Sequence, residues 1–254
     1  MIQVNLTDIY SPKHIFLWCL LSFKSGLINT AGFLITGSFV SHITGFGTQI
    51  GMAIGHHEYE FSAELLVIPF AFIFGAIITS LLLDKNYDAN KVPNYPLVQL
   101  IITLLLGLIS ILFSIRAFRM TSPEHNITTI LETGLLCLVC GLKNSLSTWS
   151  TYGKIRTTHI TGLSTDIGLH FFKLLPLKKQ LSRYPEPAKV NQVRIIMLLS
   201  FSLGACLSAL LIPIIKYKIF YLAFLFSLGL LFFSTIHRRR ILYGMNAFKK
   251  EEQV

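Results

Sequence analysis

Six apolar stretches are spaced along the chain, and each is long enough to cross a membrane as a helix. A hydrocarbon core of about 30 Å requires about 20 helical residues. Polar or proline-containing segments separate the stretches, so the pattern predicts six transmembrane helices. They are expected at residues 16–37, 63–83, 97–115, 127–149, 195–215 and 219–236.

Composition agrees with a membrane protein. The chain of 254 residues is 52% hydrophobic and only 13% charged, whereas soluble domains carry roughly 25% charged residues. The first stretch has no small-residue cleavage site behind it and contains Lys24 and Asn29, which argues against a removable signal peptide. The net charge is +10, but Lys and Arg gather in loops and in the tail. This clustering indicates topology signals, so no nucleic-acid partner is expected.

The distribution of Lys and Arg favours the six-span topology. Segment 173–194 and the basic tail 237–254 then lie on one side, while segment 56–60, which has no Lys or Arg, lies on the other. Positive loops mark the cytoplasmic side, so both termini are predicted to be cytoplasmic. In an eight-span alternative, two further polar stretches would also cross. Segment 56–60 would then be cytoplasmic, and Lys154 and Arg156 would be external.

Those two polar stretches are near-repeats of each other. Residues 41–51 begin Ser-His-Ile-Thr-Gly, and residues 158–168, which lie 117 positions later, begin Thr-His-Ile-Thr-Gly. We call them the HITG segments. Two further blocks match in the same order, which indicates a duplication. Gly26-x-x-Asn29 corresponds to Gly141-x-x-Asn144, and Phe72-x-x-Gly75-Ala76 corresponds to Phe201-x-x-Gly204-Ala205.

The duplication predicts an all-α polytopic membrane protein built as a 3+3 inverted repeat. A cytoplasmic segment, 1–14, precedes a first unit at 15–120 and a second unit at 121–236, and the tail 237–254 follows. Because each unit holds three spans, an odd number, the second unit is inverted relative to the first.

The HITG segments are expected to be re-entrant or broken. Their glycines permit turns and close backbone contact, and Thr44, Thr161 or Ser164 is expected to cap a short helix that leads out again. These helices are predicted over 50–55 and 167–175. Their positive N-terminal ends would then point at a central site for an anionic group.

Candidate site residues follow from this arrangement. An imidazole can donate, accept or carry a proton near neutral pH, and Asp166, opposite Gln49 of the first copy, breaks the symmetry as a proton or cation site. It can instead be a first-turn residue that complements the helix dipole. The predicted substrate-binding residues are Asn29, His42, Thr44, Gly45, Thr48, Asn144, His159, Thr161, Gly162, Thr165 and Asp166, and the predicted coupling residues are His42, Glu132, Lys143, His159 and Asp166.

Structural interpretations stand beside these roles. The two histidines can simply satisfy backbone groups in a glycine-rich turn, and Asn29 and Asn144 can join helices by hydrogen bonds. Gly75 and Gly204 are expected to be close-packing sites. The four cysteines fall inside apolar stretches, where thiols act as small hydrophobes, so no metal or cofactor is expected.

The remaining charges inside predicted spans must face the bundle interior or reach an interface. Glu132 and Lys143 are eleven residues apart, so they share a helix face but are too distant to pair. Lys24 and Arg156 can snorkel to the membrane surface.

Four motifs carry a resemblance to a known family. Gly26-x-x-Asn29 and residues 39–45, 140–144 and 156–162 resemble the YoaK-like family of uncharacterised bacterial inner-membrane proteins, over roughly residues 16–236. The resemblance implies a multi-pass protein of the bacterial inner membrane and supplies no activity. Family members carry Asn after the first HxTG, where this chain has Phe46. The second copy keeps the Thr-Asp pair at 165–166.

A small-solute transporter or channel is the leading functional expectation, because duplicated halves with polar breaks and ionisable groups suit alternating access. The excess positive charge favours an anionic or zwitterionic solute. Membrane lipid is a further expected partner, and a homo-oligomer is an open expectation. A structural or sensory membrane protein is an alternative, with Arg238, Arg239 and Arg240 binding anionic lipid or a partner. An intramembrane enzyme is less favoured, since no carboxylate is placed to orient either histidine.

Overall fold

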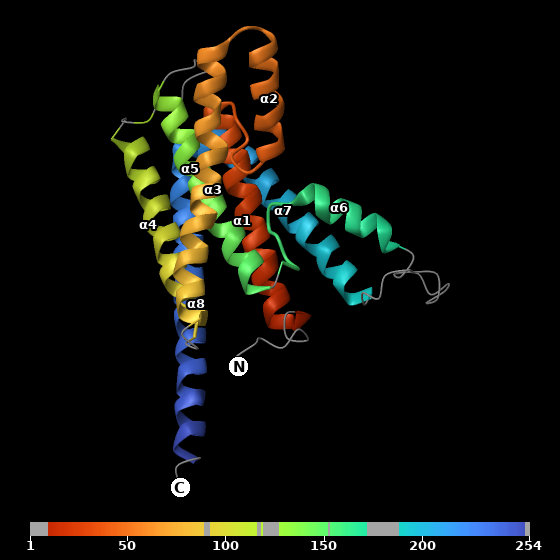
Figure 1. Ribbon diagram of the computed structural model, residues 1–254, viewed down its shortest axis with the longest axis vertical. Coiled ribbons are helices and arrows are strands. Elements are labelled where there is room, and N and C mark those ends of the chain that lie inside the picture. Colours follow the sequence, from red (N-terminus) through yellow and green to blue (C-terminus); the bar gives the residue numbers. More distant parts are fainter. Residues whose placement is uncertain are drawn as a thin grey trace.

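The computed structural model is built from helices, and the part of the chain it describes contains no strand. The described residues are 10–88, 92–115, 118, 127–151, 153–171 and 188–251. A 3₁₀ turn, η3 (Lys216–Lys218), joins the last two helices (Figure 1). The helices are α1 (Pro12–Thr36), α2 (Ile43–Gly55), α3 (Tyr59–Asp88), α4 (Tyr95–Ser114), α5 (Ile127–Ser150), α6 (Ile160–Leu169), α7 (Ala188–Ile215) and α8 (Ile219–Glu251).

Long apolar helices identify a membrane protein. Among the described residues, five continuous segments are long and apolar enough to cross a membrane, and the last of them, Ala188–Arg240, contains both α7 and α8. A positive φ of 52° at Lys216 turns the chain between these two helices. Every predicted apolar stretch therefore lies in a long helix. By contrast, α2 and α6 have 13 and 10 residues, or about 20 and 15 Å, so neither crosses a membrane alone.

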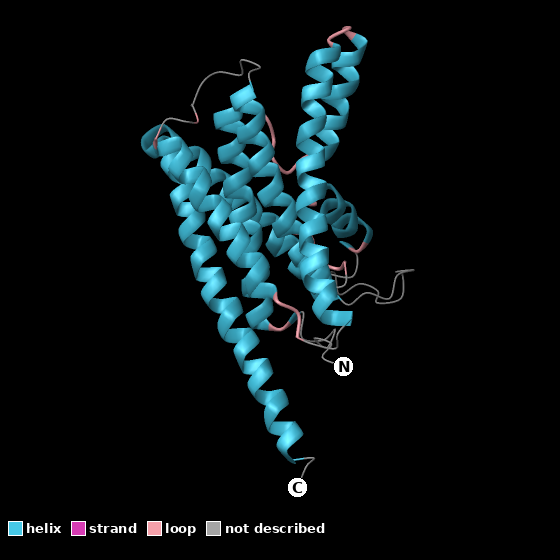
Figure 2. Ribbon diagram, turned by 60° about the vertical axis from the view of Figure 1, so that its left-hand side comes forward, coloured by secondary structure: helices cyan, strands magenta, loops and turns pink. Residues whose placement is uncertain are grey.

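Three helix pairs make up the bundle. Helix α1 packs along α7, α3 along α5 and α4 along α8, while α1 and α5 also contact each other. Figure 2 shows the long helices side by side in the bundle. The main apolar core gathers around α1 and α5, where Leu27, Ile28, Leu136 and Leu142 are completely buried. The short helices pack at the side of the bundle, α2 on α3 and α6 on α7, and Phe46 of α2 reaches the main core.

Glycines bring α1 and α7 into backbone contact. A Cβ atom added at Gly26 would overlap the carbonyl oxygen of Phe201. One added at Gly204 would overlap the carbonyl oxygen of Phe23. Any side chain at either position would therefore push the two helices apart.

The same arrangement recurs between α3 and α5. A Cβ atom added at Gly141 would overlap the carbonyl oxygen of Phe72, and one added at Gly75 would collide with that of Leu138. The prediction that Gly75 and Gly204 are close-packing sites is thus confirmed.

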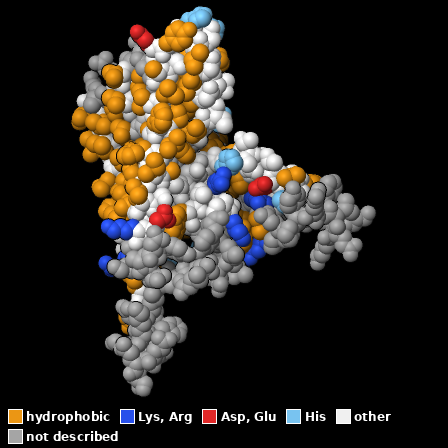
Figure 3. Space-filling model, viewed as in Figure 1, with side chains coloured by type: hydrophobic (Ala, Val, Ile, Leu, Met, Phe, Trp, Pro, Cys, Tyr) orange, Lys and Arg blue, Asp and Glu red, His pale blue; other side chains and the backbone are white. Residues whose placement is uncertain are grey.

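The outer faces of the helices are apolar, as lipid contact requires. Helix α3 exposes Phe70, Ile73, Phe74 and Ile77 along one side, and hydrophobic side chains cover this side of the molecule in Figure 3. The first residues of α1 and the last residues of α8 lie at the same end of the bundle (Figure 1).

Several helices extend beyond the predicted spans. Helix α7 begins at Ala188, so the predicted loop 173–194 is helical in its last part. Helix α8 continues to Glu251 through the predicted tail, because that segment contains no proline and few poor helix formers. The predicted seam at 121–124 and most of segment 1–14 lie outside the described residues.

Candidate functional site

The HITG segments form the first turns of α2 and α6. These helices begin at Ile43 and Ile160, with His42 and His159 as the preceding N-cap residues. Residues 50–55 and 167–169 are helical as predicted, but both helices begin earlier than predicted, inside the motif. Residues 172–175 of the second predicted helix lie outside the described residues.

Each HITG histidine folds over the glycine three residues later. A Cβ atom added at Gly45 would lie 2.9 Å from Nδ1 of His42, and one added at Gly162 would overlap the ring of His159. The glycine is thus needed so that the imidazole can cover the first helical turn. Neither histidine makes a side-chain cap hydrogen bond.

The predicted threonine and serine caps are wrong. Thr44 and Thr161 lie in the first turns, where their carbonyl oxygens accept hydrogen bonds from the hydroxyls of Thr48 (3.3 Å) and Thr165 (3.0 Å). Ser164 lies further inside α6. These polar side chains are exposed, as are both HITG histidines.

The two HITG helices run in different directions, α2 along α3 and α6 outward along α7 (Figure 1). None of the predicted HITG residues lines the cavity described below. Their shared substrate-binding role stays a prediction.

The two matched asparagines differ in their contacts. The Oδ1 atom of Asn29 accepts hydrogen bonds from the backbone N–H (3.2 Å) and the hydroxyl (2.8 Å) of Ser41. Asn29 therefore fixes the connection between α1 and α2, which differs from the predicted bond between spans. The buried Oδ1 atom of Asn144 has no hydrogen-bond partner among the described residues.

Asp166 is held by a cation from the neighbouring helix. Its Oδ2 atom lies 3.0 Å from Nη2 of Arg194 on α7, and the Arg194 side chain is only 10% exposed. The pair fastens α6 to α7. Because the guanidinium already neutralises the carboxylate, Asp166 is a poorer site for a free cation than its sequence position indicated.

Beside Arg194, three further charged side chains of the long helices are buried among the described residues. Glu132 and Lys143 on α5 and Lys24 on α1 are all almost completely inaccessible. Snorkelling of Lys24 is therefore wrong, while Arg156 is exposed. Burial of charge in a membrane core costs about 2.5 to 3.5 kcal/mol on insertion scales, so these residues require a specific explanation.

A polar network accounts for Lys24. Its Nζ atom donates to the hydroxyl of Ser227 on α8 at 3.4 Å. The same hydroxyl accepts from Nε2 of Gln99 on α4 at 2.7 Å and lies 2.9 Å from Oγ1 of Thr103. Lys24 thus belongs to a network that joins α1, α4 and α8.

Lys143 has no such network. Its buried Nζ atom lacks any hydrogen-bond partner among the described residues. An ammonium group carries three donors, so Lys143 is the least satisfied cation that the structure describes in the bundle.

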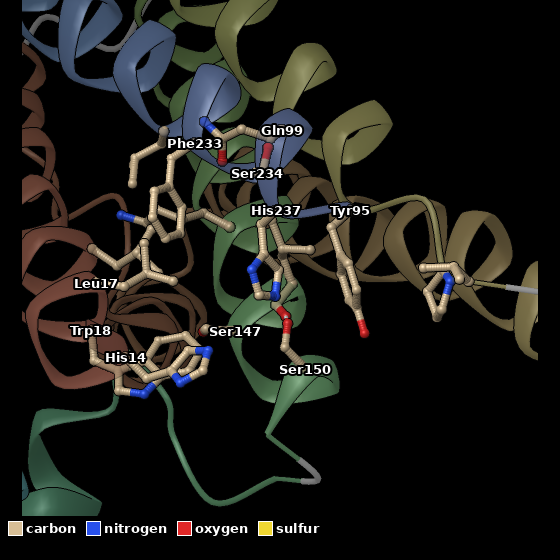
Figure 4. Close-up of a pocket in the computed structure, with 16 residues that line it drawn as sticks. His14, Leu17, Trp18, Tyr95, Gln99, Ser147, Ser150, Phe233, Ser234 and His237 are labelled. Carbon is tan, nitrogen blue, oxygen red and sulfur yellow. The ribbon is translucent and has the colours of Figure 1, made fainter. Parts of the chain in front are cut away.

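Lys143 lines a cavity of about 130 Å³ between α1, α4, α5 and α8. Besides Lys143, the lining residues include Gln99 on α4, His14 near the start of α1 and His237 on α8, where α8 enters the basic tail (Figure 4). Its walls are mostly apolar, with Leu17, Trp18 and Phe233 among them. This volume suits a small solute or several water molecules.

Aromatic rings gather at the outer part of the cavity. His14 stacks on Trp18 with ring centroids 6.3 Å apart, and its ring meets that of His237 edge-on at 6.1 Å. Phe233 in turn stacks on His237 at 6.2 Å. Figure 4 shows the two histidines facing each other across this part of the cavity.

Comparison with known proteins places the chain in a family without giving it an activity. The family model for DUF1275, described as a protein of unknown function, matches residues 17–236. The chain belongs to the DUF1275 family. No curated protein and no solved structure matches. The resemblance to an uncharacterised family is thereby confirmed at the DUF1275 level, and the narrower YoaK-like assignment stays a prediction.

For this DUF1275 protein, sequence reasoning identified Lys143 as a buried charge but missed the cavity around it. His14, Gln99 and His237 lie in three different helices, and nothing in their local sequence links them. One signal was present, because Gln99 is a large polar side chain inside an otherwise apolar stretch, and such residues face the bundle interior.

Proposed function

We propose that this DUF1275 protein is a membrane transporter or channel for a small anionic or zwitterionic solute, and that the solute binds in the cavity at Lys143. The observation that carries the proposal is that Lys143 lines the cavity while its buried Nζ atom has no hydrogen-bond partner among the described residues. The HITG segments are proposed to contribute a second polar region to the route, with His42 and His159 binding the solute or coupling its movement to protons.

The energetic argument concerns the unpaired cation. A charge that has lost its water and has no partner is strongly unfavourable, and replacement of buried charges by apolar residues is often neutral or stabilising. A lysine at this position therefore makes sense if a ligand supplies the missing negative charge.

The helix arrangement supports movement of such a solute. The crossing of α1 and α7 at Gly26 corresponds to the crossing of α5 and α3 at Gly141, and each glycine meets the carbonyl of a phenylalanine in the matching block. This correspondence supports the proposed 3+3 inverted repeat, with units 15–120 and 121–236. Two similar units of opposite orientation are the usual basis of alternating access.

The proposed orientation places the cavity on the cytoplasmic side of the bacterial inner membrane. The cavity leads towards the end where α8 enters its Arg238–Arg240 run, and basic residues mark the cytoplasmic side. Arg238 donates to the backbone oxygens of Pro93 (3.3 Å) and Val92 (3.4 Å), two residues of the cavity wall.

This contact also favours a second candidate function. Because α8 runs from the cavity wall at His237 directly into the basic tail, a lipid or protein that binds the tail would act on the cavity. A sensory membrane protein in which the cavity ligand is the signal would use the same contact. It would bind the solute without moving it.

The test is solute flux in proteoliposomes that contain wild-type protein or the Lys143→Met variant. Chloride, phosphate, glycine and benzoate would be offered separately, with empty liposomes as background and exposed Lys154→Met as the matched control. We expect wild type and Lys154→Met to take up at least one solute and Lys143→Met to fall to background. Background flux by wild type for the whole panel, or equal flux by Lys143→Met, would overturn the proposal.

A further inference from the structure

The side chains that line the cavity indicate a more specific class of ligand than any small anion. We infer that the site takes a small monocarboxylate with an apolar, ring-sized body, with the carboxylate at Lys143 and the body between the aromatic side chains nearer the mouth. This inference rests on the proposed function, since it names the solute of the same cavity.

The single ammonium group sets the charge of the ligand. Lys143 is the only Lys or Arg among the described residues of the cavity wall. Lys24 does not line the cavity and donates to Ser227 instead. One cation pairs with one carboxylate, whereas the second charge of a dicarboxylate would be left without a partner in an apolar cavity.

The absence of acidic residues from the described wall disfavours amino acids as ligands. Neither Asp nor Glu lines the cavity in the part of the chain that the structure describes. The ammonium group of a zwitterion would therefore lose its hydration without meeting a carboxylate, which is costly in a low-dielectric site. The zwitterionic option is thus disfavoured for this cavity.

The position of Lys143 along the helices sets the direction of binding. On α5, Lys143 lies two turns before Ser150, the last residue of the helix, so we infer that Lys143 lies at the inner end of the cavity and that the part near His14, Ser150 and His237 is its mouth. Between Lys143 and Ser150 the facing helices contribute Leu17, Trp18 and Phe233. A ligand would enter with its carboxylate first, and its body would remain against these apolar groups.

Aromatic side chains favour a flat body. Trp18 and Phe233 each stack against a histidine at the mouth, so planar groups already pack face to face there. Offset or edge-on packing of aromatic rings contributes affinity beyond area burial. A carboxylate such as benzoate combines a flat apolar ring with one negative charge and matches the cavity of about 130 Å³ better than a lipid would.

The experiment measures binding separately from transport. Isothermal titration of nanodisc-embedded protein would compare benzoate with four analogues of similar size: benzamide without the charge, benzylamine with the opposite charge, phenylalanine as a zwitterion and phthalate as a dianion. Acetate, which has the carboxylate but no aromatic ring, would test whether the ring contributes to binding. We expect benzoate to bind at least tenfold more tightly than each of these compounds.

Two variants test which cavity residue contacts each end of the ligand. Lys143→Met is expected to abolish the preference of benzoate over benzamide. Phe233→Leu, a conservative change that keeps an apolar wall, is expected to weaken benzoate several-fold while leaving acetate unchanged. A benzoate affinity that Lys143→Met does not change would overturn the inference.

The outcomes also separate this inference from the proposed function. If phosphate or chloride shows Lys143-dependent flux while benzoate does not bind, the monocarboxylate assignment is wrong and the transport proposal stands. If benzoate binds through Lys143 but is not moved, the ligand assignment stands and transport is wrong. Equal binding of benzoate and phenylalanine would show that the cavity accepts a zwitterion. That result would overturn the inference that the ligand is a monocarboxylate without an ammonium group, and would leave the transport proposal untouched.

Discussion

Asp166 and Arg194 form an ion pair between α6 and α7, with 3.0 Å between Oδ2 and Nη2. The pair joins the second HITG helix to a long helix of the bundle. It has no equivalent in the first unit, where the residue that matches Asp166 is Gln49. Among the described residues, the second HITG helix is therefore fixed by an ion pair, whereas the start of the first is fixed by the hydrogen bonds between Ser41 and Asn29.

Removal of the acid should loosen α6. Asp166→Asn leaves the mostly buried Arg194 guanidinium with a weaker partner, so we expect a loss of about 1 kcal/mol in the free energy of unfolding, limited because Asp166 is 43% exposed. Thermal unfolding of purified protein measures this loss. The exposed Ser164→Ala change on the same helix is the control. An unchanged unfolding temperature for Asp166→Asn would show that the pair contributes no stability.

The glycine crossings should be the positions least tolerant of a small substitution. At Gly26 and Gly141 an added methyl group meets backbone atoms that cannot move independently, so Gly26→Ala and Gly141→Ala should each destabilise the protein by about 1 to 3 kcal/mol. Gly134→Ala on α5, where an added Cβ meets nothing, should be neutral or slightly stabilising. Equal behaviour of all three variants in thermal unfolding would contradict this packing.

These crossings show which part of the fold the sequence determined clearly. Apolar length located the six long helices, and the matched glycine blocks located the closest contacts. Helix ends were less predictable, because Ala188 and Glu251 extend helices into polar segments that hydropathy treats as loops. The cavity could not be predicted, since His14, Gln99 and Lys143 meet only through the pairing of α1, α4 and α5, which a single sequence does not reveal.

The two HITG histidines are expected to be needed for solute flux and not for folding. The double change His42→Ala and His159→Ala removes two exposed rings, so the protein should remain folded and inserted. Solute flux should fall to the background of empty liposomes. The comparison is with Gly47→Ala, at a position where an added Cβ meets nothing. Normal flux by the double variant would remove the histidines from the transport route.

The topology predicts opposite exposure of two helix ends. In a variant without the four native cysteines, Glu60→Cys at the start of α3 should react with a membrane-impermeant maleimide only from outside whole cells. Tyr243→Cys on α8 should react only after the membrane is opened. Labelling of both positions from the same side would contradict both the positive-inside assignment and the inverted arrangement.

The thermal stability of Lys143→Met in lipid nanodiscs, without added solute, tests most directly whether this lysine serves a ligand. Met is apolar and of similar length, so a lysine kept for its ligand should be replaceable without loss of packing. We predict an unfolding temperature equal to or higher than that of wild type. A decrease of several degrees would show that Lys143 stabilises the bundle itself, and would contradict the assignment of its charge to a solute.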